Sequence, residues 1–211
     1  MSPEDFIRAN AGLVAPPLVP EMVLYLATEV VPLWRATEEE LAKIGVPPPY
    51  WAFAWAGGQA LARYILDNRA LVAGKTVLDL GSGSGLVGLA ARKAGAAHVL
   101  AADTDAFACT AIQLNAEANR LDITVTQDDL IGLAGSWDVI LVGDLFYERT
   151  LAERLLAWLK PLANTALLGD PGRSYFPKDG MEKLAAYTVP TSRDLEDRDI
   201  RETAVYRLSP P

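Results

Sequence analysis

From residue 74 onward, short apolar runs alternate with longer segments in which apolar residues recur every three or four positions. The short runs are typical of buried strands, and the longer segments are typical of helices that bury one face. Strands separated by helices of about 10 to 15 residues predict right-handed βαβ units and a mostly parallel sheet. The predicted strands cover residues 76–80, 98–103, 123–127, 137–144 and 165–170, and the predicted helices cover 86–94, 105–121 and 148–159.

The last 30 residues extend this pattern with one predicted helix, over 181–186, and two predicted strands, over 187–190 and 203–208. A charged segment, residues 194–199, lies between the two strands. We therefore expect a hairpin in which one strand runs antiparallel at the edge of the sheet. The predicted fold class is α/β, with a Rossmann-like, mostly parallel seven-stranded sheet and an antiparallel C-terminal edge strand.

The N-terminal part of the chain has a different pattern. The first 20 residues are expected to be irregular because Pro16, Pro17 and Pro20 interrupt them. Apolar spacing of three and four predicts a helix over 19–33, and a capping box predicts a second over 37–45. A further helix is expected over 59–68. We interpret the 211 residues as one domain, with residues 1–54 as a helical extension and residues 55–211 as the core.

Composition narrows the chemistry. The chain has 27 acidic and 19 basic residues and a net charge of −8, which argues against nucleic acid as a partner. With one cysteine, Cys109, and one histidine, His98, it can build neither an internal disulfide nor a zinc site made of several such residues. It has no apolar stretch long enough to span a membrane and no apolar signal core near residue 1. We expect a cytoplasmic protein without a metal.

The strongest motif is the segment Asp-Leu-Gly-Ser-Gly-Ser-Gly, residues 79–85, between a predicted strand and a predicted helix. Glycines allow a tight turn and close approach of a ligand to the main chain, and a helix N-terminus offers free N–H groups. The next predicted strand ends in Asp103, whose carboxylate can accept hydrogen bonds from both hydroxyls of a ribose. Together these features predict a nucleotide-like cofactor.

Two cofactors fit this pattern. The residues Gly83, Gly85 and Gly88 match the dinucleotide fingerprint, with Asp103 at the expected distance. The carboxylate of Asp79 distinguishes the two, because it would repel a pyrophosphate and attract the ammonium and sulfonium groups of S-adenosylmethionine. The sequence therefore favours S-adenosylmethionine, with S-adenosylhomocysteine as product. An NAD-binding oxidoreductase remains the alternative of a different class.

At this point the motifs resemble a known family. Residues 79–85, Asp103 and the segment Gly-Asp-Leu-Phe-Tyr at 143–147 resemble the seven-β-strand (class I) protein lysine methyltransferases. The segment 55–62 resembles the Trp-x-x-Gly motif that precedes the first strand in these enzymes. Three short segments are similar to the branch that methylates the beta subunit of electron transfer flavoprotein, namely residues 19–21, 34–38 and 169–173.

The resemblance implies roles for two groups of residues. In the donor group, the glycines Gly81, Gly83 and Gly85 would line the methionine part of the donor, with Asp79 beside its cationic end. Asp103 would hold the ribose, and Asp128 or Asp129 would lie by the adenine amino group. Trp55 would partly cover the donor. The acceptor group, at the mouth where the lysine enters, is Asp144, Phe146 and Tyr147.

The predicted function is a protein-lysine N-methyltransferase, with the beta subunit of electron transfer flavoprotein as the expected substrate. Asp144 would orient the amine rather than act as a strong base, and the aromatic rings would attract ammonium and methylated ammonium. We expect a monomer that binds neither nucleic acid nor membrane. The alternatives are a methyltransferase for another protein or a small-molecule amine, the oxidoreductase, and a non-catalytic donor-binding subunit.

Overall fold

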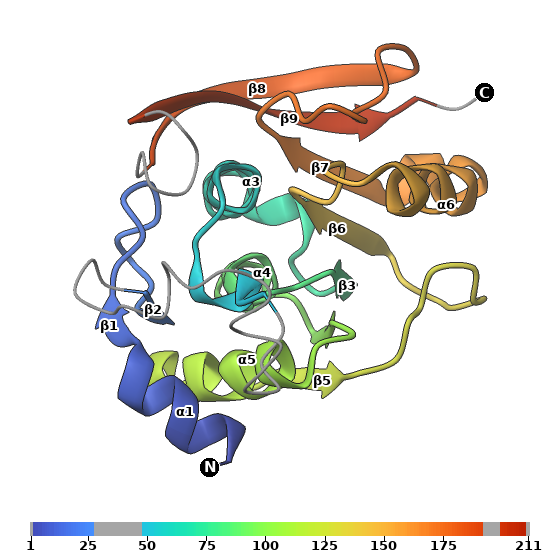
Figure 1. The fold of residues 1–211 in the computed structure, drawn as a ribbon. Helices are drawn as coiled ribbons and strands as arrows, with labels where there is room; N and C mark the ends of the chain where they lie inside the picture. Colours follow the sequence, from blue (N-terminus) through green and yellow to red (C-terminus); the bar gives the residue numbers. More distant parts are fainter. Residues whose placement is uncertain (1, 28–47, 192–198, 210–211) are drawn as a thin grey trace.

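The computed structural model describes residues 2–27, 48–191 and 199–209 (Figure 1). Its centre is a seven-stranded sheet with the strand order β5-β4-β3-β6-β7-β9-β8. The strands β3 to β7 are parallel, and β9 runs antiparallel to both of its neighbours, β7 and β8. This confirms the predicted Rossmann-like α/β class. The strands are β3 (Thr76–Leu80), β4 (His98–Ala102), β5 (Thr124–Thr126), β6 (Val139–Gly143), β7 (Ala166–Asp170), β8 (Met181–Pro190) and β9 (Ile200–Leu208).

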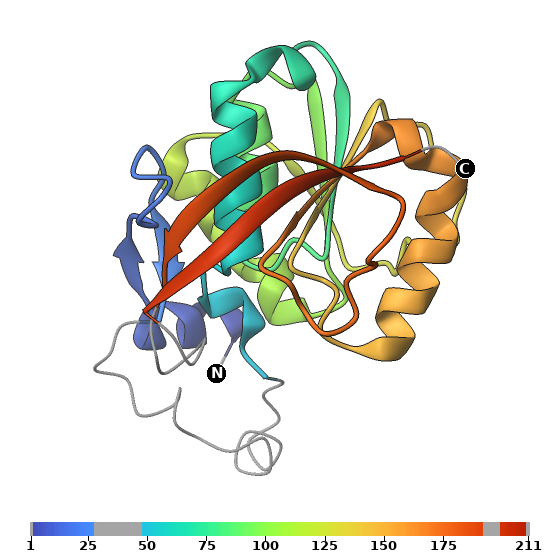
Figure 2. The same ribbon diagram turned by 90° about the horizontal axis from the view of Figure 1, so that it is seen from above.

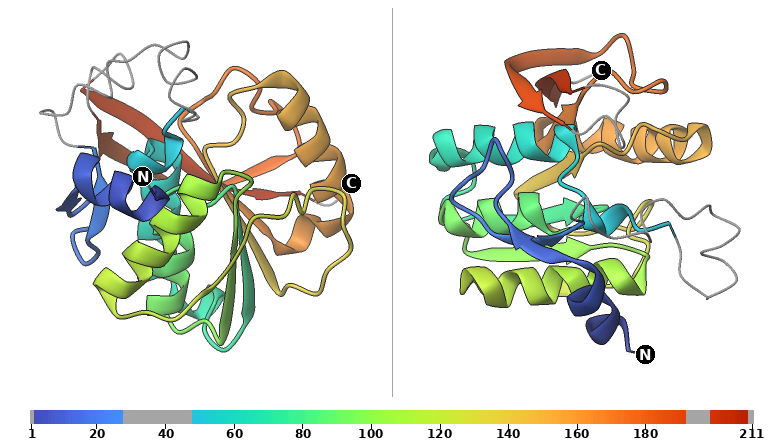
Figure 3. Two further views of the ribbon diagram at one scale, coloured as in Figure 1. Left: turned by 60° about the horizontal axis from the view of Figure 1, so that its bottom comes forward. Right: turned by 60° about the vertical axis from the view of Figure 1, so that its left-hand side comes forward.

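Helices cover both faces of this sheet. The helices α3 (Ala56–Asp67), α4 (Leu86–Lys93) and α5 (Ala106–Asn119) lie on one face, and α6 (Arg149–Leu159) lies on the other (Figures 1 and 3). Side chains cap two of them, since Asp105 accepts from the Phe107 N–H and Glu148 accepts from the N–H groups of Thr150 and Leu151. Short 3₁₀ turns are η2 (Tyr50–Ala52), η3 (Arg69–Leu71) and η4 (Lys160–Thr165).

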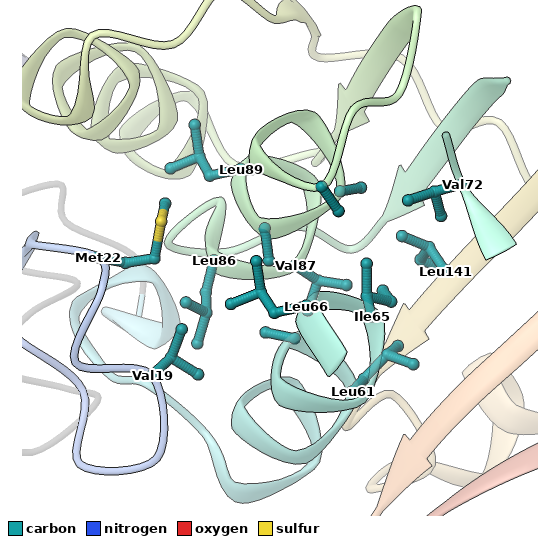
Figure 4. Packing of buried hydrophobic residues seen from close by; sticks show 14 of the residues in the cluster. Val19, Met22, Leu61, Ile65, Leu66, Val72, Leu86, Val87, Leu89 and Leu141 are labelled. Carbon is teal, nitrogen blue, oxygen red and sulfur yellow. The ribbon is translucent and has the colours of Figure 1, made fainter. Parts of the chain in front are cut away.

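Two hydrophobic cores lie on the two faces of the sheet. Neighbouring residues of β6 serve different cores, because successive strand side chains point to opposite faces. Leu141 packs with Leu61, Ile65 and other residues of α3 and α4 (Figure 4). Ile140 packs with α6 on the other face. Strands that are buried on both faces read as continuous apolar runs, which is why the sequence predicts β3, β6 and β7 well.

The N-terminal extension differs from its prediction. The chain forms α1 (Pro3–Asn10), where irregular structure was expected, because the Ser2 hydroxyl accepts a hydrogen bond from the Asp5 N–H and Pro3 suits the first turn. It then forms two antiparallel strands, β1 (Gly12–Val14) and β2 (Leu24–Leu26). The predicted helix over 19–33 is therefore wrong up to residue 27. Its last residues and the predicted helix over 37–45 lie outside the described residues.

Two asparagines of α5 explain why residues 23–26 are extended. The Oδ1 atoms of Asn115 and Asn119 accept hydrogen bonds from the N–H groups of Tyr25 and Val23, at 2.7 and 3.0 Å. The Nδ2 atom of Asn115, which is fully buried, donates to the carbonyl of Ser84 at 2.7 Å. This one side chain thus joins the N-terminal strands to the glycine loop.

The C-terminal prediction was partly wrong. The hairpin is present (Figure 2), but residues 181–186 belong to β8 and not to a helix. A register shift between Lys183 and Ala185 interrupts the strand pairing. Because a β-bulge breaks the alternation of inward and outward side chains, the apolar residues here adopt a spacing that resembles a helix. None of the helices within the described ranges is both long and apolar enough to cross a membrane.

A close contact between two glycines sets the position of α3. A Cβ atom on Gly57 would lie 2.3 Å from the carbonyl oxygen of Gly169, and one on Gly169 would lie 2.1 Å from that of Gly57. Only glycine at both positions allows the first turn of α3 to approach β7 this closely. Trp55, the residue before α3, is thereby brought to the carboxyl ends of β6 and β7.

We predict that Gly57→Ala lowers the free energy of unfolding by about 1 to 3 kcal/mol, the usual cost of overpacking a close contact. The neighbouring Gly58→Ala is the matched control, because its Cβ would meet only Val87, at an ordinary 3.7 Å. Alanine favours a helix over glycine, so this control should keep or slightly raise stability. Urea unfolding of both variants checks the prediction, and equal losses would contradict it.

Candidate active site

A cavity of about 620 Å³ lies at the carboxyl ends of the parallel strands. From β3 the chain first builds β4 and β5 on one side and then returns to place β6 on the other side of β3. Crevices at such a switch point are the usual ligand sites of open α/β sheets, and ligand pockets have volumes of about 300 to 1,000 Å³. A second, smaller cavity of about 40 Å³ shares Trp55, Gly81, Gly83 and Gly143 with the first.

The glycine loop joins β3 to α4. Gly81, Gly83 and Gly85 all have positive φ angles, at 61°, 55° and 82°, which L side chains rarely adopt. Gly81 and Gly83 line both cavities, as expected for the donor site. Gly85 instead starts α4 and packs against Ile112, so it shapes the loop without lining a cavity.

Asp79 is buried beneath this loop. Its Oδ2 accepts hydrogen bonds from the Gly88 N–H, at 2.8 Å, and from the Ser82 hydroxyl. Burial raises the pKa of Asp79 to about 6, although these hydrogen bonds oppose the shift. The residue borders the smaller cavity and not the larger one. A cationic group placed in the smaller cavity would stabilise its charged form.

Asp103 follows β4 and faces the larger cavity. One carboxylate oxygen accepts from the Gly83 N–H at 2.8 Å, and the other accepts from the Asp105 N–H at 3.0 Å. Burial raises the pKa of Asp103, and the backbone donors lower it. The side chain therefore fixes the glycine loop and still presents acceptor lone pairs toward the cavity, as binding of a ribose requires.

Asp128 and Asp129 both line the cavity and both are exposed. Asp128 accepts from the Thr126 hydroxyl at 2.6 Å. Asp129 accepts from the Ile131 N–H and from Arg154, at 3.0 and 2.7 Å, and its hydrogen bond to Arg154 lowers its pKa. The structure places both carboxylates on one wall of the cavity, so either Asp128 or Asp129 can lie beside the adenine amino group.

Asp144 directly follows β6 in a rare conformation. Its φ angle is 64°, which is uncommon for a residue other than glycine, and residues held in such conformations cluster at functional sites. Its side chain is only 6% exposed and lines the cavity. One carboxylate oxygen accepts from the Gly57 N–H at 2.7 Å, and the other forms an ion pair with Arg173.

The aromatic residues divide between the cavity and the core. Tyr147 lines the cavity, is 45% exposed, and lies 5.6 Å from the ring of Tyr50. Trp55 lies 6.1 Å from Tyr50 and donates its indole N–H to the carbonyl of that residue. Phe146, by contrast, is buried against Phe176 and lines neither cavity. Its predicted place at the mouth is therefore corrected, because one of two adjacent aromatic residues faces the core.

The lining is predominantly negative. Five carboxylates and two guanidinium groups border the larger cavity, so it favours a cationic ligand. The sequence motifs did not indicate Tyr50 or Arg154 as lining residues, nor the ion pair between Arg173 and Asp144. Tyr50 belongs to the aromatic segment 50–55 and could have been included from it, whereas Arg154 lies on an exposed face of α6 and carries no local signal. The lining carboxylates are Asp103, Asp105, Asp128, Asp129 and Asp144.

Solved structures share this fold. The magnesium protoporphyrin IX methyltransferase from Synechocystis PCC 6803, with bound S-adenosylmethionine, matches with a TM-score of 0.53 and 17% identity over 72% of this chain and 78% of its own. A tRNA (uracil-54, C5)-methyltransferase from Pyrococcus abyssi, in complex with S-adenosylhomocysteine, matches with a TM-score of 0.52 and 18% identity over 70% and 38%. The family model for ribosomal protein L11 methyltransferase (PrmA) matches residues 59–161. These structures show the fold alone, and the family model covers just under half of the chain. Together with the glycine loop they point to a class I methyltransferase that uses S-adenosylmethionine.

Curated relatives specify the family. The electron transfer flavoprotein beta subunit lysine methyltransferase of Danio rerio is 40% identical over 98% of this chain and 83% of its own length. The human protein of the same name is 38% identical over 92% and 76%. A ribosomal protein L11 methyltransferase from Dechloromonas aromatica is 34% identical over 66% of this chain but only 48% of its own. The chain belongs to the family of electron transfer flavoprotein beta subunit lysine methyltransferases. This excludes the alternative of an NAD-binding oxidoreductase.

We predict a pH-dependent effect of Asp79→Asn on stability. The pKa of Asp79 is about 6 in the folded chain, against an ordinary value of 3.8 for an aspartate, so the folded state holds the proton more tightly. The stabilisation from the protonated form is complete below pH 4 and is lost as the pH rises through 6.

Asparagine keeps one acceptor oxygen and does not ionise. Relative to the wild type, the Asp79→Asn variant should therefore gain on the order of 3 kcal/mol of unfolding free energy between pH 4 and pH 7. Urea unfolding of both proteins across this range, without donor, measures the difference. A difference that stays constant with pH would contradict the burial of a titrating carboxylate at this position.

Proposed function

We propose that this protein is a protein-lysine N-methyltransferase that methylates lysine side chains of the electron transfer flavoprotein beta subunit. The observation that carries the proposal is the length of the match, since relatives named for this activity align with 98% of the chain. That alignment includes the N-terminal extension, which the L11 methyltransferase family model does not reach. A part of the protein outside the segment matched by the family model is thus shared with these relatives.

The residues at the cavity suit this reaction. S-adenosylmethionine supplies an electrophilic methyl group on a sulfonium. The lysine nitrogen must be neutral to attack, although a free lysine has a pKa of about 10.4. The rings of Tyr50, Tyr147 and Trp55 form an apolar wall that favours the neutral amine by excluding water, and they attract the cation by cation–π contact before proton loss.

Asp144 orients the amine in this scheme. A carboxylate beside a lysine raises the pKa of the amine, so it assists docking more than deprotonation. Each transfer forms a nitrogen–carbon bond, breaks the carbon–sulfur bond and releases one proton from nitrogen to solvent. Holding the two reactants in line supplies several kcal/mol of the barrier reduction. No side chain is required to act as a strong base.

A second candidate substrate is ribosomal protein L11, because the matching family model and one relative carry that name. That relative is aligned over only 48% of its own length, so the part outside the shared core is not represented in this chain. The electron transfer flavoprotein beta subunit is therefore favoured. Another protein or a small amine remains an outcome of the experiment below.

We predict that the purified protein methylates the beta subunit of electron transfer flavoprotein from its own organism, in the presence of labelled S-adenosylmethionine. Mass spectrometry of the labelled protein should locate the methyl groups on lysine. Ribosomal protein L11 from the same organism, at equal concentration, serves as the comparison and should remain unlabelled. Label on L11 alone, or on neither protein, would overturn the proposed substrate.

We further predict that Asp144→Asn lowers kcat by about 100-fold while the donor Kd changes by less than about twofold, since charge stabilisation is lost where the amine reacts. Asparagine still offers an oxygen to the Gly57 N–H, so α3 should stay in place. The control Glu153→Gln removes an exposed carboxylate of α6 that does not line the cavity. It should leave activity unchanged. Equal loss of donor binding and turnover in Asp144→Asn would contradict the role in orienting the amine.

We also propose a cytoplasmic location and a monomeric state. The single cysteine cannot form an internal disulfide, which suits a reducing compartment. Cell fractionation would test the location, and light scattering after size-exclusion chromatography would test the monomer.

A further inference from the structure

The guanidinium of Arg173 is a positively charged group that lies in the part of the cavity around Asp144. It belongs to the segment after β7, and it lines the cavity although its side chain is only 19% exposed. Its Nε atom donates to the carboxylate of Asp144. Its guanidinium carbon lies 5.6 Å from the centre of the Trp55 ring, within the range of a cation–π contact.

The backbone holds Arg173 in this place. One carboxylate oxygen of the buried Asp170 accepts hydrogen bonds from the N–H groups of Gly172 and Arg173, both at 2.7 Å. Two residues further on, the Tyr175 N–H donates to the carbonyl of Phe146 at 3.2 Å. The segment is therefore attached to the end of β7 and to the turn after β6, and the Arg173 side chain returns from it toward Asp144.

These contacts are the ones a substrate lysine needs. An ammonium group is recognised by a carboxylate and by the face of an aromatic ring, and here the guanidinium already uses Asp144 and Trp55. The other carboxylate oxygen of Asp144 accepts from the Gly57 N–H. A second cation close to the guanidinium is disfavoured by like-charge repulsion. A lysine therefore gains access to this carboxylate and ring only as the guanidinium leaves.

We propose that Arg173 occupies the acceptor-lysine subsite as an internal cation and that docking of the substrate protein displaces its guanidinium from Asp144 and Trp55. This inference rests on the proposed function. It makes Arg173 a specificity-determining residue. A small free amine must compete with a tethered guanidinium, whereas a protein can also contact the exposed Tyr175 of the same segment and draw the segment aside.

The experiment compares Arg173→Met with the wild type in steady-state methylation of the electron transfer flavoprotein beta subunit. Methionine keeps much of the side-chain length without the charge. In the wild type, only the fraction of molecules whose guanidinium has left the subsite can bind the lysine, and this raises the apparent KM. In Arg173→Met, the KM for the protein substrate should therefore fall about fivefold, with kcat within about twofold. The matched control is Arg149→Met, which removes a guanidinium 5.4 Å from the Tyr175 ring but outside the cavity. It should change neither constant.

A second measurement identifies the subsite directly. Methylguanidinium should inhibit Arg173→Met competitively against the protein substrate, because the subsite of the Arg173 guanidinium is vacant in this variant. The Ki should be at least about fivefold below that for the wild type. Donor affinity and the thermal midpoint, measured in parallel, report whether the variant is folded. If Arg173 only positions Asp144, kcat falls, KM stays constant and methylguanidinium inhibits both proteins equally, and this result overturns the inference.

Two failures remain distinguishable. If the wild type does not methylate the beta subunit, the proposed substrate is wrong. If the wild type does so and Arg173→Met retains the wild-type KM, only the inference about Arg173 is wrong.

Discussion

The hydrogen bond from the Gly57 N–H to the carboxylate of Asp144 joins the start of α3 to the end of β6. It forms only because Gly57 and Gly169 allow backbone to approach backbone without a side chain between them. The same contact places Trp55 beside the glycine loop and leaves the second carboxylate oxygen of Asp144 to pair with Arg173. The positions of α3, of Trp55 and of the Asp144 carboxylate thus depend on one close approach of two backbone segments. Even the left-handed turn at Asp144 is held there, since its own N–H donates to the Gly169 carbonyl.

Carboxylates hold the glycine loop in its conformation without a bound ligand. Asp79 and Asp103 each accept hydrogen bonds from backbone N–H groups of the loop and helix that follow β3. The loop conformation therefore requires negative charge, or at least acceptor oxygens, beneath and beside it. That arrangement suits a cationic methyl donor and is unfavourable for a pyrophosphate. Electrostatic preorganisation and loop geometry have the same source, and part of the net acidity of the chain lies at this site.

The sequence predicted what local patterning determines. The parallel strands β3 to β7 and their helices appeared within a few residues of their observed bounds, as did the glycine loop and Asp103. Features that depend on distant partners were missed. Strand β2 is held by asparagine side chains from α5, about 90 positions away, and no apolar periodicity reports that. The helix predicted at residues 181–186 failed because a bulge in β8 imitates helical spacing. The pairing of Asp144 with Arg173 spans 29 positions and follows from the geometry of the sheet edge, and only the fold shows that Phe146 faces the core while Tyr147 faces the cavity.

The side chain of Asn115 connects the N-terminal strands to the glycine loop of the core. It accepts from the Tyr25 N–H on one side and donates to the Ser84 carbonyl on the other, inside the packed interior. Removal of the N-terminal strands would leave a buried acceptor without its donor, next to the glycine loop. The extension is therefore not a detachable accessory to the core. Evolutionary exchange of this extension for another would have to preserve a backbone donor at this one point, so the extension and the glycine loop are constrained to change together.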